Sequence, residues 1–168
     1  MYLIEDLFKR HGERLGLELI AGKRGMRRRI RVPEAHRPGL ALSGYLKGFA
    51  GKRILIIGRV EIEYLRTLTP RQRIERLEGV LSTQTPAMII ARRFRPTKEM
   101  QILCEKNNIP LLRAQMSTQN LLSRLTLLLA EEFALSVTLH GTLVEVFGVG
   151  VMIHGFGGWK KRGGTWIN

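Results

Sequence analysis

The sequence predicts an α/β protein with a mainly parallel sheet flanked by helices. Three short apolar runs between residues 54 and 113 alternate with segments of helical periodicity, which is the pattern of a parallel sheet covered by helices. These runs are apolar throughout, as in strands that are buried on both faces. We expect this domain over residues 1–133, followed by an incomplete β segment over 134–155 and an off-pattern tail over 156–168.

Residues 1–44 are predicted to form one helix, two short strands and two loops. Apolar residues recur at helical spacing in residues 1–14, which indicates the helix. Short strands are expected at 17–20 and 30–32, and a proline ends the second strand. Glycines punctuate the loop at 21–25, and a Pro-Gly pair gives turn chemistry to the loop at 36–44.

Residues 52–133 contain the alternating strands and helices. Thr69 and Pro70 form a helix start, with threonine as the cap and proline at the first helical position. Pro96 and Thr97 open another helix, and Ser117 caps the longest one. We expect strands within 52–58, 86–91 and 109–113, and helices at 61–68, 69–81, 96–108 and 117–133.

The chain is strongly basic, with 28 Lys and Arg against 14 Asp and Glu and a net charge of +14. Residues 9–37 hold ten of the cations and only three glutamates. Nucleic-acid binding is one interpretation of such a charge, and a solvated basic surface is the other. No helix-turn-helix pair, zinc spacing or aromatic-studded basic strand accompanies the charge, so the sequence favours the second interpretation.

The remaining composition suits a cytoplasmic protein. A lone cysteine, Cys104, excludes a disulfide within the chain and fits a reducing compartment. No apolar run reaches the roughly 18 to 20 residues of a membrane helix. The first residues carry acids where a signal peptide needs a basic region, so we expect neither an export signal nor a membrane partner.

Few side chains in the sequence indicate chemistry by position alone. His140 lies at a predicted strand and turn, where an imidazole could act in acid-base catalysis or simply face solvent. Arg92, Arg93 and Arg95 follow a strand, so they could hold an anion at its carboxyl end or form a charged loop rim. Cys104 lies on an apolar helical face and is interpreted as a core residue. The histidines and Cys104 show no ligand spacing, so no metal site is expected.

The tail after residue 154 matches a phosphate-binding loop only in part. The pattern G-x-x-x-x-G-K-[ST] requires a glycine at its sixth position and a hydroxyl for magnesium at its eighth. Counted from Gly155, the sixth position is Lys160, the seventh is Lys161 and the eighth is Arg162. Two of the four fixed positions fit, and we expect no competent nucleotide site here.

Residues 1–155 resemble bacterial HPr kinase/phosphorylase. The similarity rests on the segment 37–45, Arg-Pro-Gly-Leu-Ala-Leu-Ser-Gly-Tyr, and most specifically on 139–151, Leu-His-Gly-Thr-Leu-Val-Glu-Val-Phe-Gly-Val-Gly-Val. Weaker matching segments are 17–22, 57–65, 86–90, 109–113 and 117–118.

The resemblance implies a first domain similar to the amino-terminal domain of some Mur ligases, followed by a kinase domain. The family phosphorylates a serine of the phosphocarrier HPr with ATP or pyrophosphate and Mg²⁺, reverses this by phosphorolysis, and assembles as a hexamer. It acts in the phosphotransferase system and carbon catabolite repression. His140 matches a catalytic histidine of the family, Lys161 matches the phosphate-loop lysine, and Gly155 and Gly158 match its nucleotide-binding glycines.

The departure from the family begins at the phosphate loop. The family continues well past this loop, with further catalytic residues that have no counterpart here. We interpret residues 156–168 as translated in another reading frame, so that the chain corresponds to a truncated enzyme. It is then expected to be inactive and to bind neither Mg²⁺ nor ATP or pyrophosphate. A stand-alone ligand- or partner-binding module and a basic nucleic-acid-binding domain remain the alternatives.

Overall fold

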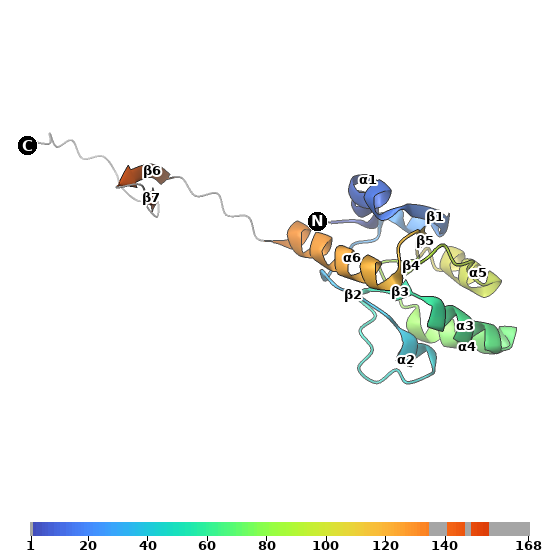
Figure 1. Ribbon diagram of the computed structural model, residues 1–168. Coiled ribbons are helices and arrows are strands. Elements are labelled where there is room, and N and C mark those ends of the chain that lie inside the picture. The colour runs from blue at the N-terminus through green and yellow to red at the C-terminus, as the bar shows by residue number, and fades with distance from the viewer. Residues whose placement is uncertain (1, 135–140, 147–148, 155–168) are drawn as a thin grey trace, which may run out of the picture. The chain divides into compact units, whose positions relative to one another are not determined.

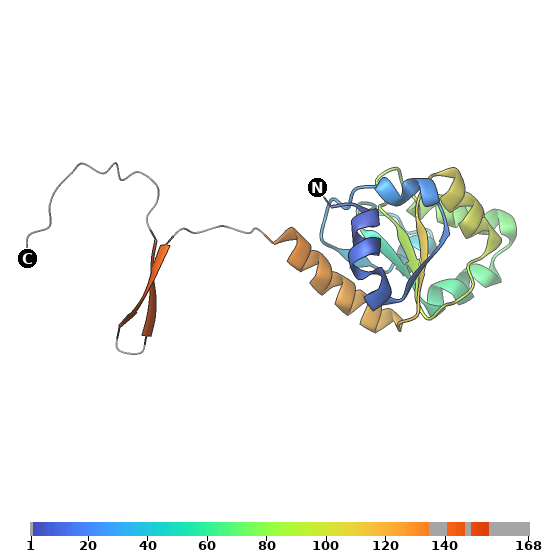
Figure 2. The same cartoon turned by 90° about the horizontal axis from the view of Figure 1, so that it is seen from above.

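The computed structural model describes residues 2–134, 141–146 and 149–154, and it divides the chain into two units, Met1–Ala134 and Leu135–Asn168. The first unit has three layers, with helices on both faces of a five-stranded sheet (Figures 1 and 2). This arrangement confirms the predicted α/β class.

The sheet is mainly parallel, as predicted. Its order is β1-β5-β4-β3-β2, in which β2, β3, β4 and β5 pair in parallel and β1 adds an antiparallel edge. Every residue of β3 and β4 is buried, which explains why these strands read as unbroken apolar runs. The strands are β1 (Leu17–Ala21), β2 (Ala35–His36), β3 (Ile54–Ile57), β4 (Met88–Ile90) and β5 (Leu111–Ala114).

Two hydrophobic cores lie on the two faces of the sheet. Because side chains alternate along a strand, Leu55 and Ile57 enter one core while Ile54 and Ile56 enter the other. The first core is covered by α2 (Gly39–Leu42), α3 (Arg59–Thr67), α4 (Pro70–Val80) and α5 (Lys98–Lys106), and the second by α1 (Ile4–Leu15) and α6 (Thr118–Phe133). Cys104 is fully buried in the first core, as predicted, and burial raises the pKa of its thiol to about 12.

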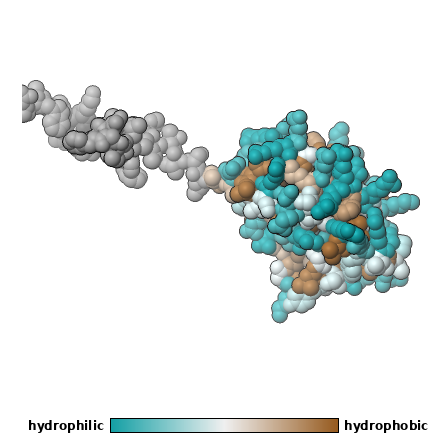
Figure 3. Space-filling view, in the orientation of Figure 1, coloured by the Kyte–Doolittle hydropathy of each residue, from teal (hydrophilic) through white to brown (hydrophobic). Residues whose placement is uncertain are grey.

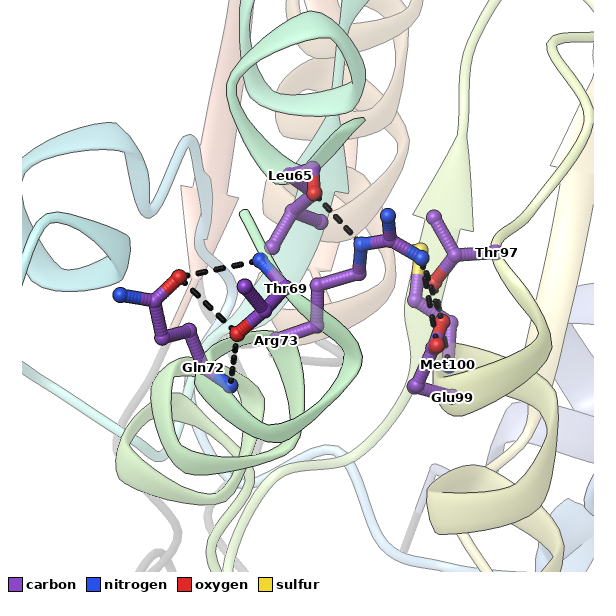
Figure 4. A network of polar contacts seen from close by, with 7 residues as sticks. All are labelled: Leu65, Thr69, Gln72, Arg73, Thr97, Glu99 and Met100. Carbon is purple, nitrogen blue, oxygen red and sulfur yellow. Dashed lines mark hydrogen bonds and ion pairs between the residues drawn. The ribbon is translucent and has the colours of Figure 1, made fainter. Parts of the chain in front are cut away.

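Helix starts agree with the capping residues in the sequence. The Thr69 hydroxyl accepts from the Gln72 amide, while the Gln72 side chain accepts from the Thr69 amide at 3.0 Å. Figure 4 shows this capping box beside Arg73, which donates to the Leu65 carbonyl at 2.7 Å and pairs with Glu99 at 3.2 Å. The Arg73 side chain therefore joins the end of α3 and the start of α5 to α4.

Three predictions for the first 44 residues are wrong. Residues 30–32 do not form a strand. The neighbouring Arg29 makes only an isolated antiparallel bridge with Leu3, in which the Ile30 amide donates to the Tyr2 carbonyl, and the Ile30 side chain is buried against α1 and α6. The edge position beside β3 belongs instead to Ala35–His36. The predicted loop at 36–44 contains the four-residue helix α2, and the 3-10 helix Lys23–Arg27 overlaps the predicted loop at 21–25 and extends beyond it.

Hydrophilic residues cover most of the face shown in Figure 3, with hydrophobic residues in small groups. The most exposed large apolar side chains, Leu40, Val60, Ile102 and Leu127, come from four different helices. Within the described residues, no helix has the length and apolar character needed to cross a bilayer.

The second unit contains an antiparallel pair, β6 (Gly141–Val146) and β7 (Val149–His154). Its register runs from Gly141 opposite His154 to Val146 opposite Val149. That these are the first strands of a kinase domain stays a prediction.

Candidate anion-binding site

The four site residues predicted from the resemblance, His140, Gly155, Gly158 and Lys161, all lie outside the described residues. Their catalytic and nucleotide-binding roles stay predictions. The described part of the chain offers a different site, at the carboxyl edge of the parallel sheet.

A hollow of about 710 Å³ opens at this edge. Chain segments that leave the strands there reach opposite faces of the sheet, since β3 leads into α3 and β5 leads into α6. The crevice outside the carboxyl ends of the strands is where open α/β sheets bind ligands. The hollow is lined by Arg37, Arg59, Val60, Glu63, Arg92, Phe94 and Thr118.

A buried carboxylate fixes one wall of the hollow. Glu61 is only 3% exposed, accepts from the Gly58 amide at 2.9 Å, and receives two parallel hydrogen bonds from Arg37. These come from Nε at 3.0 Å and Nη2 at 2.9 Å, the bidentate geometry that arginine forms with carboxylates. Since Arg37 uses Nε and Nη2 in this way, its Nη1 has no hydrogen-bond partner among the described residues.

Arg92 supplies the second cation from an unusual backbone turn. Arg92 and Arg93 have φ values of 55° and 51°, in the left-handed region that L-residues rarely adopt. Their amides donate to the Met116 and Ala114 carbonyls at 2.8 and 2.9 Å, so this turn ties the end of β4 to the end of β5 and the segment after it. Arg92 lines the hollow, whereas Arg93 and Arg95 do not.

Two helix starts approach each other closely beside the hollow. A Cβ placed on Gly58 would lie 2.8 Å from the Thr118 hydroxyl, so only glycine allows these two positions to meet. Gly58 caps α3, and Thr118 is the first residue of α6. Arg59 completes the ring of cations and pairs with Glu63 on the exposed side of α3 at 2.6 Å.

The sequence pointed to this site only through Arg92. Arg37, Arg59 and Thr118 were missed, although each lies just after a strand or at a helix start that leaves the same edge. The sequence signal that could have indicated this site was the presence of cations after successive apolar runs. No group of three or more His, Cys, Asp or Glu that could hold a metal occurs in the described ranges, the hollow included.

Comparison with known proteins shows which family the domain belongs to. The family model described as HPr Serine kinase N terminus matches residues 3–129, about three quarters of the chain. The chain belongs to this family. The HPr kinase/phosphorylase of Exiguobacterium sp. is 37% identical over 149 residues, which cover 89% of this chain and 48% of that relative. The chain thus spans about half the length of the relative, and the resemblance read from the sequence is confirmed.

The matched segment contains the whole arginine-lined hollow of the HPr serine kinase N-terminal domain. Arg37, Arg59, Arg92 and Thr118 lie inside residues 3–129, whereas His140 and Lys161 lie beyond it. The hollow is therefore a feature of the amino-terminal domain itself.

Proposed function

We propose that this chain is the regulatory and assembly half of an HPr kinase/phosphorylase. The observation that carries the proposal is the family match over residues 3–129, together with 37% identity to a protein named HPr kinase/phosphorylase. The complete enzyme would phosphorylate a serine of the phosphocarrier HPr with ATP or pyrophosphate and remove that phosphate by phosphorolysis. It would work in the cytoplasm as a hexamer, in carbon catabolite control through the phosphotransferase system.

The chemistry of the phosphoryl transfer is not assigned to this chain. Residues 155–162 offer Lys161 to a phosphate but place Lys160 where the loop turns on glycine and Arg162 where a hydroxyl would bind Mg²⁺. Because this donor set does not fit a nucleotide with its magnesium ion, we derive no catalytic step from it. We expect no turnover from the chain alone when HPr is supplied with ATP or pyrophosphate.

A chimera tests the regulatory and assembly role. Residues 1–134 of this chain would replace the amino-terminal half of the Exiguobacterium enzyme, and the catalytic half of that enzyme alone would be the control. We expect the chimera to assemble like the parent enzyme and to phosphorylate HPr, measured by sedimentation and by phosphate incorporation. A chimera that behaves no differently from the isolated catalytic half would contradict the proposal.

A ligand-binding module is the second candidate function, favoured by the arginine-lined hollow. The nucleic-acid alternative has weaker support. Four of the ten cations in residues 9–37 have partners within the protein. Lys9 pairs with Glu5, Arg10 with Glu132 and Arg37 with Glu61. Arg28 donates to backbone carbonyls. Retention on DNA with a steep salt dependence would revive that alternative.

A further inference from the structure

We propose that the hollow lined by Arg37, Arg59, Arg92 and Thr118 binds a small organic phosphate. Its residues all belong to the first unit and do not include the phosphate loop expected near Lys161, and the proposal does not depend on the proposed kinase function. The chemical class follows from three properties of the hollow: its unsatisfied donors, its charge and its apolar wall.

The donors are arginine N–H groups that have no hydrogen-bond partner among the residues the structure describes. Glu61 occupies Nε and Nη2 of Arg37, so Nη1 is left with its two N–H groups, held in place by the buried pair. Arg59 uses only Nε toward Glu63. The Arg92 side chain makes no hydrogen bond or ion pair with any described residue. Planar N–H groups of this kind match the oxygens of a phosphate.

The charge balance favours an anion. The lining holds three guanidinium groups against one carboxylate, Glu63, and the other nearby carboxylate, Glu61, is buried behind Arg37. Like charges are gathered at the cost of mutual repulsion, and a bound anion would relieve it. The left-handed turn at Arg92 and Arg93 is a further cost at the same place, as is frequent at ligand sites.

The apolar wall points to an organic phosphate over the inorganic ion. Val60 is 65% exposed on the first turn of α3, and Phe94 packs partly on the first core while its remaining surface lines the hollow. The volume of about 710 Å³ exceeds what a phosphate ion fills and falls in the range of small-molecule pockets. An aromatic or sugar group attached to the phosphate could therefore contact Val60 and Phe94.

Calorimetric titration of the full chain with phenyl phosphate and with inorganic phosphate tests this inference. The variant is Arg92→Gln, and the matched control is Arg93→Gln, which removes the same charge from the neighbouring left-handed residue outside the hollow. Lys161→Gln reports on binding at the tail. We expect phenyl phosphate to bind more tightly than inorganic phosphate, and Arg92→Gln to weaken it about tenfold, the loss of one charge-assisted hydrogen bond.

The controls separate this site from its alternatives. Binding that persists in Arg93→Gln and Lys161→Gln but is lost in Arg92→Gln supports the hollow. Equal weakening by both arginine variants would show a diffuse electrostatic effect and overturn the proposal. Loss only in Lys161→Gln would assign the phosphate to the tail, and absence of binding to the unmodified chain would also overturn the proposal. None of these outcomes bears on the chimera experiment.

Discussion

Arg28 and Arg92 carry the same guanidinium group but differ in its hydrogen-bond partners. Arg28 is partly buried and directs its guanidinium at five backbone carbonyls, those of Ser82, Thr83, Thr85, Asn107 and Asn108. Burial lowers its pKa below the usual arginine value. Arg92 is exposed and has no hydrogen-bond or ion-pair partner among the described residues.

This difference shows that the excess of positive charge has two separate roles in the molecule. Arg28 donates to backbone carbonyls in the two segments that follow α4 and α5, and so ties these segments together. Its cation thus contributes to the fold. The arginines at the sheet edge instead keep donors available, which costs stability and suits a ligand. A count of basic residues does not distinguish these roles, but the acceptor that each guanidinium has found does.

The largest expected effect concerns Glu61, which fixes Arg37 at the hollow. Glu61→Ala leaves Arg37 and the Gly58 amide without their acceptor, so we expect a loss of about 3 kcal/mol in unfolding free energy by urea titration. Glu63→Ala is the control, because its pair with Arg59 is exposed to solvent and should stabilise the fold far less. Equal losses in the two variants would mean that the buried pair does not organise this edge.

Arg28→Met tests the structural side of the comparison. It keeps an unbranched side chain but removes every donor to the five carbonyls, and we expect a loss of about 2 kcal/mol. Arg27→Met is the matched control, since Arg27 is exposed and makes no hydrogen bond among the described residues. If the two variants unfold at the same urea concentration, the carbonyl contacts of Arg28 contribute nothing.

The fold was largely predictable because local signals and burial agree. The all-apolar runs of β3 and β4 are set by the two cores, and the caps at Thr69, Thr97 and Ser117 mark helix starts through their own hydrogen bonds. The errors lie where strand pairing, and not the local sequence, decides the secondary structure. Residues 30–32 are as strand-like as Ala35–His36, but only the latter pair lies beside β3.

The site was less predictable because it depends on proximity between distant segments. Arg37 and Glu61 are 24 residues apart, and the approach of Gly58 to Thr118 follows from the crossing of two chain segments. Arg92 could be noticed from its place after a strand, yet the sequence did not distinguish it from Arg93. Their different positions relative to the hollow arise from the left-handed turn.

Measuring the unfolding free energy at several pH values extends the comparison to a third arginine, Arg10. Its guanidinium group pairs with Glu132 at 2.9 Å. Burial acts to raise the pKa of Glu132, but hydrogen bonds from His11 and Arg10 outweigh it and lower the pKa below the usual value. A lowered folded-state pKa gives stability above the unfolded pKa that is lost as pH falls through the folded value. We expect Glu132→Gln to cost up to about 1 kcal/mol at pH 7 and progressively less as the pH falls below the usual pKa of a glutamate. A cost that does not change with pH would assign the effect to packing.

The smallest expected effect belongs to Arg92. Arg92→Gln removes a guanidinium group that has no hydrogen-bond or ion-pair partner among the described residues, and it relieves charge repulsion with Arg37 and Arg59. The unfolding free energy should therefore change by less than about 0.5 kcal/mol. Arg93→Gln, measured in the same buffer, controls for the left-handed backbone that both positions share. A loss comparable to that of Arg28→Met would mean that Arg92 has an acceptor within the protein. The cations of the hollow would then be structural, and the contrast between the two arginines would disappear.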